Sequence, residues 1–178
     1  MSDIYISWLE YHQKIEELAV KIYQSSWDFN QIVCIARGGL RVGDILSRLY
    51  RQPLAIFSAA SYGGLENRIR GKITLSQHLA MTTSELGNKV LLVDDLVDSG
   101  VSLQESIQWL QQHYCDRISQ IRTAVLWYKA NSAIAPDYYV EYLPHNPWIH
   151  QPFEPYDRIT LCELAQRYPP SSRVKRQV

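Results

Sequence analysis

Several things are scarce in this sequence, and each scarcity excludes a class of protein. Three cysteines in 178 residues, an odd number at wide spacing, argue against a disulfide framework and for reduced thiols in a cytosol. Lysine and arginine together number 18, as do aspartate and glutamate, so no net charge favours nucleic acid or acidic membranes. No apolar run approaches the roughly 20 residues of a membrane span, and the N-terminus lacks the features of a signal peptide. We expect a cytoplasmic protein with no nucleic-acid or membrane partner.

The chain also lacks internal repeats and any shift of composition that would mark a domain boundary. Its length suits one domain with a sizeable core, which we place over residues 1–168. Residues 169–178 are polar and basic, and we expect a disordered tail there.

What the sequence does contain is a strand-like run that ends in two adjacent acids. Residues 90–93 are all apolar, which is typical of a strand buried on both faces inside a parallel sheet. Asp94 and Asp95 follow directly, and two buried carboxylates need hydroxyl, cation or backbone partners. They therefore mark the carboxyl edge of the sheet, where the ligands of open α/β folds bind.

A turn of small polar residues comes next and leads into an amphipathic helix that begins near Ser102. Such a turn brings backbone N–H groups together, and the helix adds its positive end, so a phosphate fits there. The hydroxyls of Ser99 and Ser102 complete the cradle. Paired carboxylates suit either the two hydroxyls of a ribose or a hydrated Mg²⁺ that bridges to phosphates. Together these features indicate a ribose-phosphate site.

Two other interpretations of the paired acids exist. Adjacent acids after an apolar strand also occur in the Walker B element of P-loop proteins, but the chain contains no G-x-x-x-x-G-K-[ST] sequence. The second interpretation is that the two acids form the solvated end of a strand and have no function.

Residues 94–102 resemble the ribose-phosphate signature of the type I phosphoribosyltransferases, and the chain looks most like their bacterial xanthine-guanine branch. Serines stand here at two positions where the family often has threonine, and Val101 stands where a small residue is common. The resemblance implies that the whole run binds 5-phosphoribosyl 1-pyrophosphate (PRPP). These residues are Asp94, Asp95, Leu96, Val97, Asp98, Ser99, Gly100, Val101 and Ser102.

A second apolar run, residues 31–36, predicts a strand that ends in Arg37, Gly38 and Gly39 before a helical pattern. Glycines at a strand end permit a backbone that exposes its amides to an anion. From these residues alone, a plain glycine turn between strand and helix explains the pattern equally well. In the resembled family the Arg-Gly pair forms the pyrophosphate loop, where a strained peptide bond presents its N–H. The resemblance therefore implies PRPP contacts for Arg37 and Gly38.

The segment after a third predicted strand, residues 54–58, is polar, glycine-bearing and basic. Residues 61–72 have the composition of a loop that closes over anionic phosphates and excludes water, with an ordinary solvated hairpin as the alternative. The family has a flexible hood at this place. The resemblance makes Arg68 a PRPP contact, with Arg70 and Lys72 as possible substitutes. The returning strand is predicted from three apolar residues, Ile73, Leu75 and Leu79.

Two later segments resemble a purine pocket. A strand predicted over residues 121–128 ends at Lys129, where the family has a lysine that hydrogen-bonds the 6-oxo group of a purine. After a last strand over residues 138–143, prolines bracket Trp148 and Ile149 in a pattern that matches the family nearly residue for residue. The resemblance implies that the Trp148 ring stacks on the base and that backbone carbonyls around Ile149 read it.

The resemblance implies the type I phosphoribosyltransferase fold. In this α/β fold a five-stranded parallel sheet has helices on both faces and a small hood built from the chain ends. Helices are predicted over residues 8–24, where a capping box begins at Ser7, and over residues 103–113. The family usually forms homodimers or homotetramers, which we also expect here.

The implied reaction is transfer of phosphoribose from PRPP to N9 of guanine, xanthine or hypoxanthine. The resemblance implies Mg²⁺ as the cofactor, bound near Asp95, and Asp98 as the catalytic residue beside N7 of the purine. Glu154 stands where the family has an aspartate near a second Mg²⁺, and its extra methylene weakens that role.

Two alternatives stay open at this point. One is a PRPP-binding regulator without catalysis that binds RNA or DNA; the neutral net charge and the presence of Lys129, Trp148 and Ile149 argue against it. The other is a phosphoribosyltransferase for another base, such as adenine or a pyrimidine. Lys129 argues against adenine, because a cation does not suit a 6-amino group.

Overall fold

The computed structural model of the chain describes residues 3–61 and 73–168. The predicted hood contact Arg68, with Arg70 and Lys72, lies outside the described residues, as does the predicted tail over residues 169–178.

A parallel sheet forms the centre of the molecule. Its strands run in the spatial order β3, β2, β6, β8 and β9, and every neighbouring pair among them is parallel. This arrangement confirms the predicted five-stranded parallel sheet. In chain order the strands are β2 (Gln31–Ala36), β3 (Leu54–Ser61), β6 (Lys89–Val93), β8 (Gln120–Lys129) and β9 (Tyr138–Leu143).

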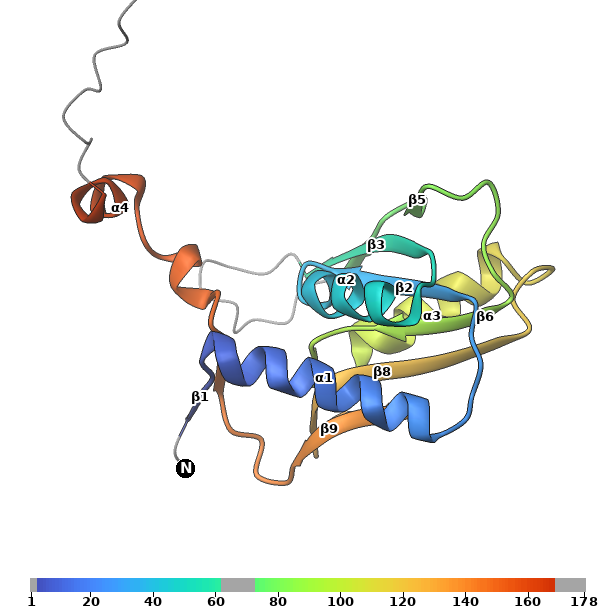
Figure 1. The fold of residues 1–178 in the computed structure, drawn as a ribbon, viewed down its shortest axis with the longest axis horizontal. Helices are drawn as coiled ribbons and strands as arrows, with labels where there is room; N and C mark the ends of the chain where they lie inside the picture. The colour runs from blue at the N-terminus through green and yellow to red at the C-terminus, as the bar shows by residue number, and fades with distance from the viewer. Residues whose placement is uncertain (1–2, 62–72, 169–178) are drawn as a thin grey trace, which may run out of the picture.

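Helices cover both faces of this sheet (Figure 1). Helices α1 (Trp8–Gln24) and α2 (Gly39–Tyr50) pack on one face, where Ile15 and Leu46 join a core with Leu91 and Val93. Helix α3 (Val101–His113) packs on the other face against Val90, Leu92 and their neighbours. Because β6 alternates its side chains between the two cores, it is buried on both faces as predicted.

Three short strands extend the sheet. Strands β4 (Ile73–Leu75) and β5 (Ala80–Met81) pair antiparallel with β3, so the predicted returning strand is two strands, and Leu79 lies between them. Strand β7 (Leu96–Val97) pairs with β8 just beyond β6. The sequence predicted a loop over these two residues, whereas the structure resumes the strand there.

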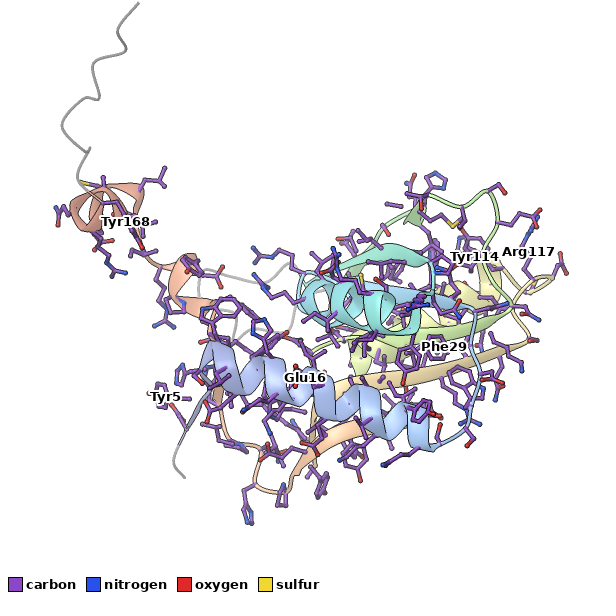
Figure 2. The ribbon with its side chains drawn as sticks, in the orientation of Figure 1. Tyr5, Glu16, Phe29, Tyr114, Arg117 and Tyr168 are labelled. Atoms are coloured by element: carbon purple, nitrogen blue, oxygen red, sulfur yellow. The ribbon has the colours of Figure 1, made fainter. Side chains whose placement is uncertain are left out.

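A separate small sheet joins a strand near the N-terminus to one much later in the chain. Strand β1 (Ile4–Tyr5) pairs in parallel with β10 (Ile149–His150). A 3₁₀ helix, η1 (Glu154–Asp157), and helix α4 (Leu161–Arg167) follow β10 and form an arm that extends from the body of the molecule (Figures 1 and 2). Helix α4 buries none of its residues. Among the described residues, no helix is both long and apolar enough to cross a membrane.

Candidate active site

The two carboxylates lie between β6 and β7, at the carboxyl edge of the sheet. Both flanking strands pair with β8, and the carbonyl of Asp95 accepts hydrogen bonds from the amides of Leu126 and Trp127 at 3.0 and 3.2 Å. The Asp95 amide donates to Asp94 Oδ1 at 2.9 Å. The backbone that carries the acids is therefore held at both ends, which favours a preorganised site.

Burial makes this pair costly to ionise. It raises the pKa of Asp95 to about 6, and burial together with the charge of Asp95 raises the pKa of Asp94. Gln151 donates from Nε2 to Asp95 Oδ2 at 3.2 Å, and the Gly39 amide also donates to Asp94. A ligand that brings hydroxyl donors or a cation would favour the charged form of both acids.

The Arg37–Gly38 turn packs directly against these acids. A Cβ atom at Gly38 would lie 2.7 Å from Asp95 Cγ and 3.0 Å from Asp94 Oδ1, so any side chain at this position would displace the acids. The Ala36–Arg37 peptide bond is cis. Helix α2 begins at Gly39 without a side-chain cap, and its Leu40 amide donates to the Arg37 carbonyl at 3.2 Å.

The loop from Asp98 to Ser102 forms a second anion-binding environment. Gly100 is the N-cap of α3 with φ +81°, and no side chain caps the helix. A Cβ at Gly100 would also lie 2.5 Å from Ser132 Oγ, so both its conformation and its packing require glycine. This N-terminus borders a pocket of about 160 Å³. The pocket is lined by Asp94, Asp95, Leu96, Val97, Asp98, Ser99, Gly100, Ser102 and Leu103, which includes every predicted ribose-phosphate residue except Val101.

Lys129, Asp98 and Trp148 come from three separate segments and meet beside this loop. The Lys129 side chain is only 5% exposed, and its Nζ lies 3.6 Å from Asp98 Oδ2. The same Nζ lies 5.7 Å from the centre of the Trp148 ring. Asp98 is also held by Asn131, whose Nδ2 donates to Oδ1 at 3.1 Å. The partly exposed Trp148 ring and the two charged groups form a surface on which a planar ligand with a carbonyl can rest.

Ile149 takes part in this surface through its backbone. Its side chain is 4% exposed and belongs to the core under α1. The carbonyls of Trp148 and His150 accept from the amides of Ile4 and Ile6 at 2.8 and 3.0 Å. Because carbonyls alternate along a strand, that of Ile149 points away from β1. It is therefore the carbonyl of this strand that is directed away from the small sheet.

Glu154 does not lie with the acid pair. Its Oε2 is 3.2 Å from His150 Nδ1, and His150 Nε2 is 3.0 Å from Asp3 Oδ2. The predicted interpretation of Glu154 as a second metal residue receives no support from these contacts.

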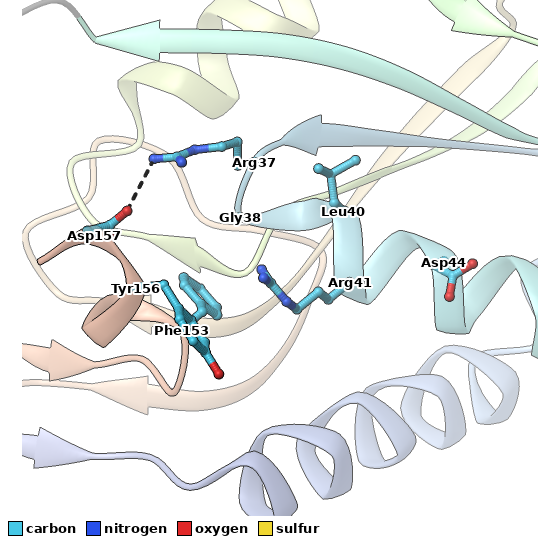
Figure 3. Close-up of a pocket in the computed structure, with 8 residues that line it drawn as sticks. All are labelled: Arg37, Gly38, Leu40, Arg41, Asp44, Phe153, Tyr156 and Asp157. Carbon is cyan, nitrogen blue, oxygen red and sulfur yellow. Dashed lines mark ion pairs between the residues drawn. The ribbon is translucent and has the colours of Figure 1, made fainter. Parts of the chain in front are cut away.

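A larger pocket of about 590 Å³ lies on the other side of the glycine turn. Figure 3 shows Arg37 extending towards Asp157 of η1, to which its Nη2 lies at 3.8 Å, and Arg41 extending from α2 towards Phe153. Because Gly38 lines this pocket and touches both acids, the two pockets meet at the carboxylate pair. The pocket is lined by Arg37, Gly38, Leu40, Arg41, Asp44, Phe153, Tyr156 and Asp157.

The sequence interpretation missed three residues of this site, Arg41, Asn131 and Gln151. A signal existed for Arg41, a second arginine only four residues after Arg37 and close to the predicted glycine turn. Asn131 and Gln151 gave no such signal, since only the fold brings them to Asp98 and Asp95.

Comparisons with known proteins point to one family. A family model for the phosphoribosyl transferase domain matches residues 7–158. The xanthine-guanine phosphoribosyltransferase of Idiomarina loihiensis is 27% identical over 153 residues, which cover 85% of this chain and 87% of the relative. The enzyme of that name from Gluconobacter oxydans is 28% identical over 150 residues, 84% of this chain and 83% of the relative. The solved structure of a purine phosphoribosyltransferase from Pyrococcus horikoshii has a TM-score of 0.68 and 26% identity, and the match covers 86% of this chain and 95% of that one.

Proposed function

The chain belongs to the phosphoribosyl transferase family, and on that premise we propose that it transfers phosphoribose from PRPP to N9 of a 6-oxopurine. The products are a purine nucleoside monophosphate and pyrophosphate, as in purine salvage. The main support for the proposal is that Lys129, Asp98 and Trp148 lie close together beside the ribose-phosphate loop.

The two pockets suit the two ends of PRPP. The open N-terminus of α3, with Ser99 and Ser102, suits the 5-phosphate, because its free amides point at an anion. Asp94 and Asp95 suit the ribose hydroxyls between the pockets. Arg37 and the Gly38 turn suit the pyrophosphate, whose developing charge they stabilise as the C1–O bond breaks.

The residues at the acid pair also fit Mg²⁺, which prefers oxygen ligands and keeps several of its waters. In residues 3–61 and 73–168, no group of three acids, histidines or cysteines is placed to hold a metal alone. Asp95, with Asp94 beside it, would therefore hold the ion jointly with PRPP oxygens. When bound, Mg²⁺ would neutralise charge on the leaving pyrophosphate.

The base is recognised by polar groups from separate elements. Lys129 donates to the 6-oxo group, Trp148 stacks on the ring, and the Ile149 carbonyl faces the 2-position. Asp98 lies next to N7, where its carboxylate accepts a proton as general base or stabilises the reactive tautomer. The N9 lone pair then forms the bond to C1 as pyrophosphate leaves.

We include three further statements in this proposal. Residues 1–168 form the catalytic domain, the protein works in the cytoplasm, and it forms a homodimer or homotetramer. The odd number and wide spacing of the cysteines in the sequence support the cytoplasm.

The test is pyrophosphate release by the purified protein with PRPP and Mg²⁺. Guanine, xanthine, hypoxanthine, adenine, uracil and orotate are offered separately. Release with 6-oxopurines alone is the expected result, and the rates rank the three substrates. Release with adenine or a pyrimidine would overturn the purine assignment. Absence of release with every base, together with measurable PRPP binding, would favour the PRPP-binding regulator.

A further inference from the structure

Arg41 occupies a position on the wall of the larger pocket that the roles above leave unexplained. It lies in the first turn of α2, four residues after Arg37, and both arginines line the pocket of about 590 Å³. Figure 3 shows its side chain extending from α2 into the space between the glycine turn and Phe153.

Two aromatic rings lie against the Arg41 guanidinium. Its Cζ lies 4.4 Å from the centre of the Phe153 ring and 5.6 Å from that of Trp8. A guanidinium stacked on a ring face keeps its N–H groups free at its edge, where they suit a planar or tetrahedral oxyanion. The stack also reduces the rotamer entropy that a flexible arginine loses when it binds an anion.

The charged surroundings of Arg41 indicate which groups its guanidinium faces. Within the described parts of the chain, Arg41 makes no ion pair or side-chain hydrogen bond, and the nearby Asp44 pairs with Arg48 at 3.0 Å. The charge of Arg41 opposes the rise that burial causes in the pKa of Asp95, which indicates that it faces the acid pair. Arg41 therefore lies on the same pocket wall as Arg37 and beside the site proposed for Mg²⁺.

We propose that Arg41 is a second diphosphate-binding residue, which holds the pyrophosphate group of PRPP, and pyrophosphate after the reaction, together with Arg37. Two guanidinium groups line one pocket, and although Asp157 lies 3.8 Å from Arg37, paired guanidinium groups suit a diphosphate better than a monophosphate. The inference rests on the proposed function for PRPP but concerns only the anion that this pocket binds.

The test measures inorganic pyrophosphate binding by calorimetry, with Mg²⁺ and without any base. Arg41→Met keeps an apolar stem against Phe153 and Trp8 but removes the charge, and Arg41→Lys keeps the charge without the fork. Arg48→Met is the matched control, because Arg48 lies on the same helix, pairs with Asp44 and lies outside the pocket. Thermal unfolding of each variant reports whether the fold is intact.

Arg41→Met is expected to weaken pyrophosphate binding about 10- to 100-fold, as loss of a hydrogen-bonded charge does. Inorganic phosphate binding should change less, Arg41→Lys should restore part of the loss, and Arg48→Met should bind like the wild type. In turnover assays the KM for PRPP should rise while the KM for the base stays the same.

Pyrophosphate binding by Arg41→Met within about twofold of Arg48→Met would overturn the inference, as would a wild type that does not bind pyrophosphate. The two proposals fail separately. Loss of pyrophosphate binding in Arg41→Met supports the inference even when no base is turned over. If the protein turns over a base but its pyrophosphate binding does not depend on Arg41, the proposed function stands and the role of Arg41 is rejected.

Discussion

Asp98 differs from the other two acids of the site in its surroundings. Its side chain is 51% exposed, with Lys129 on one oxygen and Asn131 on the other. It therefore keeps a fixed orientation while remaining open to a ligand, as a proton acceptor must.

We predict that Asp98→Ala loses most of the turnover, about 10²- to 10⁴-fold in kcat, because the proton acceptor at N7 is gone. PRPP binding should persist, since the other loop residues and the α3 N-terminus are unchanged. Steady-state rates and PRPP calorimetry check both expectations. Asp116→Ala, at an exposed position after α3, serves as the control. A kcat for Asp98→Ala equal to that of this control would contradict the assignment.

Asp94 and Asp95 should lower the stability of the protein at neutral pH. Their pKa values are raised in the folded state, so folding binds protons between about pH 4, near the ordinary value of 3.8, and the value of about 6 for Asp95. The free energy of unfolding should therefore fall as the pH rises through this window.

Asp94→Asn keeps the oxygen that accepts from the Asp95 amide and removes one charge. We predict that it raises the free energy of unfolding on the order of 1 kcal/mol at neutral pH, while it lowers activity. Urea unfolding in metal-free buffer checks the first expectation at about pH 7.5 and about pH 4. The gain should disappear at the lower pH, where both carboxyls of the wild type are neutral. A variant less stable than the wild type at the higher pH would argue against this account.

The candidate residues that local sequence patterns revealed lie at the ends of apolar runs. Asp94 could be found because a strand that stops at a charged residue places it at the sheet edge, whereas Lys129, also at a strand end, was assigned through the family resemblance. Asn131 could not, because only the approach of the segment after β8 to the α3 loop brings it to Asp98. Arg41 lies within a helix that the sequence predicts from its apolar positions, and these positions give no role to its polar residues.

Among the elements, those with a local signal were predicted best. Helix α1 has the predicted bounds because Ser7 and Glu10 form the capping box that the sequence indicates. Helix α3 begins at Val101, two residues before the prediction, because Gly100 ends the loop with a positive φ. Strand β7 was missed, since its pairing depends on β8, which comes later in the chain.

The small β1–β10 sheet should depend on pH through His150. Hydrogen bonds to Asp3 and to Glu154 raise the pKa of His150 above 6.5, while partial desolvation opposes them. Protonated His150 therefore stabilises the folded state. Its contribution is complete below the ordinary pKa of histidine and is lost as the pH rises through the higher pKa of the folded state. Since Trp148 and Ile149 belong to the same segment, loosening of this sheet would reach the base surface.

We predict that Asp3→Asn lowers the pKa of His150 towards its ordinary value, because it removes the larger of the two acceptor effects. An NMR titration of the His150 ring measures the shift, and His113 on α3, which contacts Trp109, is the internal control. Unchanged titration of His150 in the variant would show that Asp3 does not hold the ring.

At the scale of the whole molecule, helix α4 is separate from the core, whereas η1 contacts it through the Arg37–Asp157 pair. The family match ends at residue 158, and helix α4 begins at Leu161 and buries no residue. Its capping box between Thr160 and Glu163 accounts for the helix locally, without support from the sheet.

A chain that ends after Ile159 should therefore fold as well as the full chain. We expect its free energy of unfolding to stay within about 0.5 kcal/mol, because surface changes away from the core have effects of this size. Urea unfolding of both chains checks this, with truncation before β10 as the destabilising control, since Ile149 is a core residue. A large loss of stability after removal of α4 alone would show that the arm packs on a surface of the protein in solution.

The contact between Gly38 and the acid pair has a consequence for the evolution of this chain. The turn after β2 and the acids after β6 are 56 residues apart in sequence, counted from Gly38 to Asp94, yet each limits the space of the other. A side chain at position 38 requires the Asp95 carboxyl, and to a smaller extent that of Asp94, to move or to be replaced by a smaller group. Substitutions in the two segments should therefore be coupled. A descendant that lost the acids would be free to lose the glycine as well.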